Sequence, residues 1–352
     1  MKTALTIAGS DSGGGAGIQA DLKSFAAVGV HGASVVTCVT AQNTKAVTSI
    51  FPLPSSEIQA QLRAVLDDFE VRGAKTGMLY SREIVETVAD ELGGTDFPLV
   101  VDPVMVATVG ARLELDDFRD ALVERLLPRA DLVTPNRREA ERLSGLSIQG
   151  IEDMEAAANA IRDLGAHAVL VKGGHVAGEL VDVLVDGRTV HRFRGFRHAK
   201  ELHGAGCTLA ASIAGYLAQG QSLVRAIESA RRRVAAGFLT SYRAGQGVEI
   251  INSHVLPDRY EVWLALMRTA PELSRATPRR MRPRQGIEMT YALPGAANLH
   301  DLCVWREGRG SALFGGLGTD VRLLLEVLHV NPTLRASATL KYSPQNSRTR
   351  AR

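Results

Sequence analysis

Short apolar runs alternate with longer amphipathic stretches from residue 1 to about residue 245. The apolar runs predict buried strands, and the stretches between them return apolar residues every three or four positions, as helices do. The predicted strands are Thr3–Ala8, Ala33–Val39, Ala74–Met78, Leu99–Asp102, Leu132–Thr134 and Ala168–Lys172. The predicted helices are Ala20–Val28, Ile58–Asp68, Glu83–Leu92 and Met154–Leu164. Strands that alternate with helices predict an α/β fold whose mostly parallel central sheet is covered on both faces.

The pattern changes in the later part of the chain. Asp186-Gly187 separates two apolar runs and predicts a hairpin over residues 181–193. After Ile251 comes a predicted helix over Tyr260–Met267, followed by three prolines among arginines, which is the composition of a linker. We expect an α/β domain over residues 1–255, a helix and Pro/Arg-rich linker over 256–285, and a small α+β appendage over 286–352. The appendage is expected to hold a helix over Val321–Val330, a strand over Ala336–Lys341 and a disordered end.

Composition narrows the function classes. The 352 residues are 45% hydrophobic and 22% charged, and no apolar run approaches the roughly 18 residues that a membrane span needs. No secretory leader is apparent, so we expect a cytoplasmic protein without a membrane partner. Three cysteines lie far apart and indicate neither a disulfide framework nor a zinc site. The net charge is +3, with an excess of eight positive charges after Met267, but the arginines lack interleaved aromatic residues and do not favour nucleic-acid binding.

A glycine-rich loop follows the first predicted strand. The sequence AGSDSGGGAGIQADLK places five glycines within residues 9–17, directly before a helix. Glycines permit positive φ angles and let a ligand approach the backbone closely. The loop lacks the Gly-Lys-Ser/Thr of a Walker A motif and the spacing of a dinucleotide fingerprint. The alternative is a tight turn capped by Asp11.

A second loop leads into a helix at HGAGCTLA, residues 203–210. Free N–H groups at a helix start form an anion site, and Gly204, Ala205 and Gly206 would present them to a transferring phosphoryl group. Cys207 stands at the same helix start, where we expect the pKa of its thiol to fall so that a thiolate can accept a proton. The alternative is a small residue that packs at a helix start.

Two further motifs end predicted strands. In TPNRREA, Asn136 and Glu139 lie three residues apart on one helix face and could hold a hydrated magnesium ion through oxygen atoms. The alternative is a capping box, with Asn136 as N-cap and Glu139 at the third helical position. In VLVKGGH, Lys172 ends an apolar strand and is placed to reach phosphate oxygens.

At this point the chain resembles a known family. The glycine loop, TAQNT at 40–44, KTGML at 75–79, VDPVMVA at 101–107 and the three later motifs occur in the order found in hydroxymethylpyrimidine/phosphomethylpyrimidine kinases of the ribokinase-like superfamily. The resemblance covers about residues 2–255. It implies a ribokinase-like three-layer sandwich, usually a homodimer, that uses ATP and Mg²⁺. It also implies two steps: phosphorylation of 4-amino-5-hydroxymethyl-2-methylpyrimidine, then of its monophosphate, in thiamine biosynthesis.

The resemblance also implies roles for individual residues. The implied pyrimidine-site residues are Gln42, which would bond the aminopyrimidine, with Gly9, Asp11, Met78 and Val104. The implied nucleotide and magnesium residues are Lys172, Asn136 and Glu139, the last two through water. The implied catalytic residues are Cys207, in place of the superfamily's usual aspartate, and the anion-hole residues Gly204, Ala205 and Gly206.

The sequence departs from the family in places. It reads Thr108-Val109-Gly110-Ala111 where the family usually has Lys-Ser-Gly-Asp, and Leu202 replaces the threonine usual before His-Gly. Residues 286–342 resemble a fragment of the archaeal-type thiamine-phosphate synthase domain, with Thr319 where a histidine is expected, so we expect no synthase activity. Two alternative functions stay open: pyridoxal or pyridoxine kinase activity on the same fold, and a sensor that binds pyrimidine or thiamine phosphates without turnover.

Overall fold

A computed structural model describes residues 1–108, 110–173, 180–195, 202–254, 258–283, 286–292, 302–308, 312–314 and 336–338. The chain divides into two compact units, Met1–His254 and Val255–Arg352. No helix in the described parts is long and apolar enough to cross a membrane. The helix predicted over Val321–Val330 lies outside the described residues.

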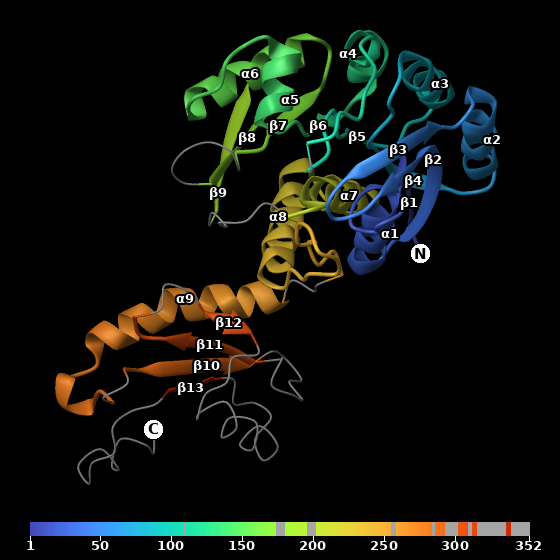
Figure 1. Ribbon diagram of the computed structural model, residues 1–352. Coiled ribbons are helices and arrows are strands. Elements are labelled where there is room, and N and C mark those ends of the chain that lie inside the picture. Colours follow the sequence, from blue (N-terminus) through green and yellow to red (C-terminus); the bar gives the residue numbers. More distant parts are fainter. Residues whose placement is uncertain are drawn as a thin grey trace. The chain divides into compact units, whose positions relative to one another are not determined.

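The first unit is built on one nine-stranded sheet with the strand order β3-β2-β1-β4-β5-β6-β7-β8-β9 (Figure 1). Its strands are β1 Thr3–Asp11, β2 His31–Gln42, β3 Val47–Pro52, β4 Val71–Thr76, β5 Leu99–Val101, β6 Leu132–Val133, β7 Ala168–Val171, β8 Leu180–Asp186 and β9 Thr189–Gly195. Strands β2, β1, β4, β5, β6 and β7 pair in parallel, while β3, β8 and β9 join as antiparallel edges. The six predicted strands and the hairpin are confirmed.

Helices cover both faces of this sheet. They are α1 Gly17–Val28, α2 Ser55–Leu66, α3 Arg82–Leu92, α4 Phe118–Ala121, α5 Arg137–Ser144, α6 Ile151–Asp163, α7 Ala205–Ala218 and α8 Leu223–Leu239. In Figure 1, α1, α7 and α8 lie on one side of the sheet, and α2, α3, α5 and α6 on the other. Successive strand residues face opposite sides, so Leu99 and Val101 enter one core and Val100 the other. The predicted α/β three-layer architecture is confirmed.

Strand β3 was not predicted. It pairs antiparallel with β2, so that Phe51 lies opposite Val39 at the sheet edge. Its residues are exposed or half-exposed, and Phe51 is 63% exposed. Because neither face of β3 is fully buried, its sequence lacks the apolar run that marked the central strands.

The second unit joins one long helix to a four-stranded sheet. The helix is α9 Asp258–Ala276, followed by the 3₁₀ turn η3 Arg279–Met281. The sheet has the strand order β12-β11-β10-β13, and its strands are β10 Glu288–Ala292, β11 Leu302–Arg306, β12 Leu313–Phe314 and β13 Ala336–Ala338. The strand predicted over Ala336–Lys341 is thus present in its first three residues.

The linker prediction for residues 271–284 is wrong for the part described. Helix α9 continues through Pro271 to Ala276, because Leu266, Ala270 and Ser274 form one buried helix face. Beyond the helix, Arg282 donates from Nε to the Thr277 carbonyl oxygen at 3.0 Å and from Nη1 to Glu307 Oε1 at 3.0 Å. These contacts fold the arginine-rich stretch against its own unit. Sequence alone could not show that partner surface.

Candidate active site

Every residue that the sequence analysis placed in the site lies at the carboxyl edge of the parallel sheet or at a helix start beside it. They comprise Gly9 and Asp11 on β1, Gln42 at the end of β2, Met78 and Val104 after β4 and β5, Asn136 and Glu139 at the start of α5, Lys172 after β7, and Gly204, Ala205, Gly206 and Cys207 at the start of α7. This is the edge at which open α/β sheets bind their ligands. Two groups of contacts form there, one around Asp11 and one around Lys172.

Asp11 organises the glycine-rich loop. Its Oδ1 accepts a hydrogen bond from the Gly13 N–H at 2.8 Å, and its Oδ2 accepts from Gly15 and Ala16 at 2.9 and 2.8 Å. The His203 Nε2 lies 2.9 Å from the same Oδ2. Burial alone would raise the pKa of Asp11, but the bonds from His203, Ala16 and Gly13 outweigh it and hold that pKa below its usual value.

The glycine-rich loop and the start of α7 interlock. Gly204 has a φ of +83°, and a Cβ built there would lie 1.8 Å from the Gly15 carbonyl oxygen. A Cβ at Gly15 would lie 2.4 Å from His203 Cδ2. A side chain at Gly204 would meet the loop backbone, and one at Gly15 would meet the His203 ring, so glycine is required at both positions. Motifs nearly 190 residues apart in sequence therefore form one surface.

Gln42 lies beside the Asp11 group. Gln42 Nε2 is 3.3 Å from His203 Nε2, but His203 Nε2 donates its proton to Asp11, so these two donors are in contact without a hydrogen bond. Thr40 Oγ1 donates to Gln42 Oε1 at 3.3 Å. Met78 packs beside Gly9, whose missing side chain would start 3.2 Å from the Met78 sulfur. The position of His203 between Asp11 and Gln42 could not be predicted from its motif.

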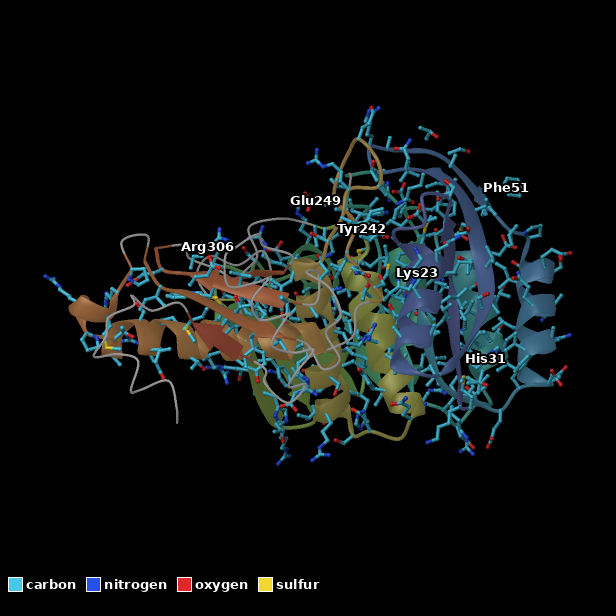
Figure 2. The ribbon with its side chains drawn as sticks, turned by 90° about the horizontal axis from the view of Figure 1, so that it is seen from below. Lys23, His31, Phe51, Tyr242, Glu249 and Arg306 are labelled. Atoms are coloured by element: carbon cyan, nitrogen blue, oxygen red, sulfur yellow. The ribbon has the colours of Figure 1, made fainter. Side chains whose placement is uncertain are left out.

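Residues 241–251, which follow α8, hold His203 and the loop after Gln42 in place through backbone hydrogen bonds. Tyr242 and Ile250 pair across this segment, and Figure 2 marks Tyr242 and Glu249 on it. The backbone of His203 is held by the Glu249 carbonyl oxygen and the Ile251 N–H, at 2.9 and 3.1 Å. The Val248 N–H donates to the Thr44 carbonyl oxygen at 2.9 Å, so the segment also secures the loop after Gln42. Sequence analysis assigned it no role.

The second group centres on Lys172 and Asp102. Lys172 Nζ lies 3.0 Å from Asp102 Oδ1, which also accepts from Thr134 Oγ1 at 3.1 Å. Burial alone would lower the pKa of Lys172, but Asp102 and Glu139 outweigh it and keep the ammonium charged. A Cβ at Gly206 would lie 3.5 Å from Lys172 Nζ, so the α7 N-terminus faces this cation. Asp102 was part of a quoted motif, but sequence analysis assigned it no role.

The capping box considered for Asn136 and Glu139 is present. Asn136 Oδ1 accepts from the Glu139 N–H at 3.0 Å, and Glu139 Oε2 accepts from the Asn136 N–H at 2.8 Å. Burial raises the pKa of Glu139 to about 7, with Lys172 opposing this effect and Asp102 adding to it. The Asn136 amide oxygen is taken up by the cap, and the Glu139 carboxylate also accepts from the Met105 backbone, so a metal ion would reach either residue through water.

The Lys172 group fits a magnesium ion only if the ion keeps part of its water shell. Within the described residues, no three His, Cys, Asp or Glu side chains are close enough to hold a metal ion. Mg²⁺ usually keeps several waters and binds one or two carboxylates together with substrate phosphates. Asp102 and Glu139 supply such carboxylates. The residues therefore fit a magnesium ion that arrives with a nucleotide.

Cys207 lies in the first turn of α7, as predicted, but its acidity differs from the prediction. Burial raises the pKa of the Cys207 thiol to about 11, with Asp21 and Asp102 adding to the rise. Lys75 and the Gly17 N–H act in the opposite direction. The expectation of a lowered thiol pKa is thus wrong, because loss of water around the half-buried side chain outweighs the effects of Lys75 and the Gly17 N–H.

The departures from the family pattern lie beside this edge. Val106 and Arg112 pair as an antiparallel bridge, and the Ala107 N–H donates to the Ala111 carbonyl oxygen at 2.8 Å. Thr108 and Gly110 are exposed. Leu202 is buried, so an apolar side chain suits its position. Neither departure disturbs the Asp11 or Lys172 contacts.

Comparison with known proteins decides the family. The model of the family described as phosphomethylpyrimidine kinase matches residues 11–252. The chain belongs to the phosphomethylpyrimidine kinase family. It is 46% identical over 245 residues to a hydroxymethylpyrimidine/phosphomethylpyrimidine kinase of Streptomyces coelicolor. This match covers 69% of this chain and 91% of the relative. It is 49% identical over 249 residues to the Rhizobium meliloti enzyme of the same name, covering 69% and 94%.

Solved structures agree with this family assignment. Bacillus subtilis pyridoxal kinase in its ADP complex aligns with a TM-score of 0.67 and 38% identity, covering 71% of this chain and 97% of that one. A phosphomethylpyrimidine kinase of Clostridium difficile aligns with a TM-score of 0.61 and 40% identity, covering 67% and 98%. The ribokinase-like fold predicted from the motifs is confirmed.

Proposed function

We propose that the chain transfers the γ-phosphoryl group of ATP to 4-amino-5-hydroxymethyl-2-methylpyrimidine, and then to the monophosphate, in thiamine biosynthesis. The observation that carries the proposal is the family match over residues 11–252. It is supported by the close contact between the glycine-rich loop and the start of α7 at one edge of the sheet. The Geobacter sulfurreducens relative, 49% identical over 257 residues, is named a thiamine biosynthesis bifunctional protein. This chain spans 52% of that relative.

The Asp11 group is suited to the pyrimidine. Gln42 offers an amide with both a donor and an acceptor, which matches the donor and acceptor edge of an aminopyrimidine. Thr40 Oγ1 donates to the oxygen of that amide and fixes its orientation. Met78, Gly9 and Val104 supply apolar surface and close backbone approach beside it. Such a site binds a flat ring and reads one polar edge.

The Lys172 group is suited to the phosphates of ATP. Phosphoryl transfer depends on positioning and charge stabilisation. Lys172 supplies a cation, and the N–H groups of Ala205, Gly206 and Cys207 at the α7 start supply donors. Asp102 and Glu139 would hold magnesium through water. When bound, that ion would neutralise charge on the β- and γ-phosphates.

Cys207 follows Gly206 in the first turn of α7 and is the proposed base. The acceptor hydroxyl would give its proton to the Cys207 thiolate while its oxygen bonds the γ-phosphorus. The bond from that phosphorus to the bridging oxygen of ADP would break, and ADP would leave with the electron pair. The raised thiol pKa means that only a small fraction is thiolate at neutral pH.

Turnover with two substrates tests the function. The chain should consume ATP with hydroxymethylpyrimidine much faster than with pyridoxine or without acceptor. In Gln42→Ala, kcat/KM should fall strongly for the pyrimidine and little for pyridoxine. Pyridoxine lacks the aminopyrimidine edge, so it makes no bond to the Gln42 amide that the substitution could remove. Val190→Ala, an exposed edge-strand change, is the control. Faster turnover of pyridoxine would favour the pyridoxal kinase alternative, and absence of turnover with every acceptor would favour the sensor.

Two further properties are proposed with this function. The chain forms a homodimer, as the family resemblance implies, and sedimentation equilibrium of the full chain tests it. A monomer at micromolar concentration would contradict it. We also propose that it acts in the cytoplasm, where ATP is available, and cell fractionation checks that location.

A further inference from the structure

One fully buried ion pair lies outside the contacts described so far. Lys75 Nζ on β4 and Asp21 Oδ2 on α1 are 2.9 Å apart, and both side chains are 0% exposed. Thr6 Oγ1 donates to the same Asp21 oxygen at 2.6 Å. Asp21 Oδ1 has no hydrogen-bond partner in the described parts of the chain. Because well-packed apolar residues often stabilise such a position at least as well, the pair calls for a functional reason.

The position of Lys75 connects the pair to the site. A Cβ built at Gly73 would lie 2.8 Å from the Ala214 carbonyl oxygen, so that face of β4 packs against the last turns of α7. Lys75 is two residues further along the same face. At the other end of α7, a Cβ at Gly206 would lie 3.8 Å from Asp102 Oδ2, just beyond the end of β5, which runs parallel to β4. Helix α7 therefore runs in the opposite direction to β4, and its first turn, with Cys207, lies towards Lys75. Gly77 lies two residues beyond Lys75 on the same face, and a Cβ built there would lie 2.6 Å from Lys75 Nζ.

The residue before Cys207 lies close to the Lys172 group. A Cβ built at Gly206 would lie 3.5 Å from Lys172 Nζ. Lys172 and Asp102 are bonded to each other and form the pair assigned above to the nucleotide side. Lys75 is a second buried cation on this side of the sheet, and its partner is Asp21. Lys75 lowers the pKa of the Cys207 thiol, whereas Asp21 and Asp102 raise it.

We propose that Lys75 is a positioning residue of this kinase, whose buried ammonium group is the counter-ion of the Cys207 thiolate. This rests on the proposed function, in which the thiolate takes the proton of the acceptor hydroxyl. Lys75 favours the charged form of Cys207 before that transfer. Asp21 holds Lys75 in place but opposes the thiolate. The two members of one ion pair therefore act on Cys207 with opposite signs.

The alkylation rate of Cys207 tests this without any substrate. Iodoacetamide reacts with the thiolate, and peptide mass spectrometry separates Cys207 from the buried Cys38 and Cys303. With the full chain at about pH 9, Lys75→Met should slow alkylation about tenfold or more, the effect of a one-unit shift by an opposite charge. Asp21→Asn should accelerate it. Lys2→Met, which alters an exposed lysine bonded to the Gln219 carbonyl oxygen, should leave the rate unchanged.

A double variant separates charge from folding. Lys75→Met leaves a buried carboxylate without its partner and can fail to fold, whereas Lys75→Met with Asp21→Asn removes both charges. We expect the double variant to fold, as judged by circular dichroism, and to alkylate about tenfold more slowly than Asp21→Asn alone, because the two differ only in the Lys75 charge. It should also show a lower kcat than Asp21→Asn, with unchanged KM for the pyrimidine. Equal alkylation rates in Asp21→Asn and the folded double variant would overturn the proposal. If alkylation responds as expected but no pyrimidine is phosphorylated, the proposed function fails and the Lys75–Cys207 coupling stands.

Discussion

At the scale of single residues, the surroundings decide which acids of the site are charged. Asp11 is buried, yet its pKa is lowered because three loop N–H groups and His203 donate to its carboxylate. Glu139 is buried and Cys207 is half-buried; both receive fewer compensating donors, and loss of water raises the pKa of both groups. The same sheet edge therefore holds a permanent anion beside two groups that titrate at or above neutral pH.

The pH dependence of turnover follows from the Cys207 thiol. Because its pKa is about 11, the thiolate fraction, and with it kcat, should rise about tenfold per pH unit between about pH 7 and pH 9. Cys207→Ala should lower kcat about 10²–10⁴-fold at neutral pH with little change in KM, and should remove this slope. Steady-state rates across the pH range measure both effects. Near-normal kcat in the variant would leave the α7 N–H groups as the main catalytic feature.

At the scale of elements, the site depends on two backbone segments that touch without side chains between them. The glycine-rich loop meets the start of α7 at Gly15 and Gly204, and residues 241–251 hold His203 from the other side. The phosphoryl-side donors and the pyrimidine pocket are thus positioned by one junction. A shift of α7 would disturb both.

Gly204→Ala tests that junction. The new Cβ would lie 1.8 Å from the Gly15 carbonyl oxygen, so the glycine-rich loop must move. In addition, the alanine at position 204 must adopt a left-handed backbone conformation. Gly187→Ala is the matched control, because Gly187 also has a positive φ, of 55°, but a Cβ there meets nothing within 4 Å. We expect the control to lose about 1–2 kcal/mol in unfolding free energy and keep its kcat, while Gly204→Ala also loses most of its kcat. Equal kcat in both variants would show that the junction is not needed for turnover.

Sequence could predict the elements whose pattern is local. The central strands and the helices over them carry clear apolar periodicity, and the motifs fall at strand ends, so the sheet edge was predictable. The bond between Asp11 and His203 was not, because 192 residues separate its partners. The passage of α9 through Pro271 depends on a packing surface contributed by β10 and β11, which the local composition does not reveal. The thiol pKa of Cys207 required knowledge of its burial.

At the scale of the whole molecule, the chain consists of two units, and the family match falls within the first of them. The family model ends at residue 252, and the first unit ends at His254. The relatives from Streptomyces coelicolor and Rhizobium meliloti each match 69% of this chain. The second unit has its own helix-covered sheet, and Trp263 Nε1 on α9 donates to the Ala312 carbonyl oxygen at 3.1 Å inside it. The kinase site therefore draws all of its described residues from the first unit.

Two truncations test whether the first unit is sufficient. Truncation after Ser253 keeps the bond from Arg233 Nη2 to the Ser253 carbonyl oxygen at 2.7 Å and the contact between the Ser253 and Thr208 hydroxyls at 2.9 Å. We expect this form to fold and to phosphorylate the pyrimidine at the rate of the full chain. Truncation after Gly247 removes the backbone partners of His203 and should abolish turnover, because His203 is then no longer held against Asp11. Circular dichroism and ATP consumption measure the two forms. Loss of kinase activity in the longer form would make the second unit part of the catalytic fold.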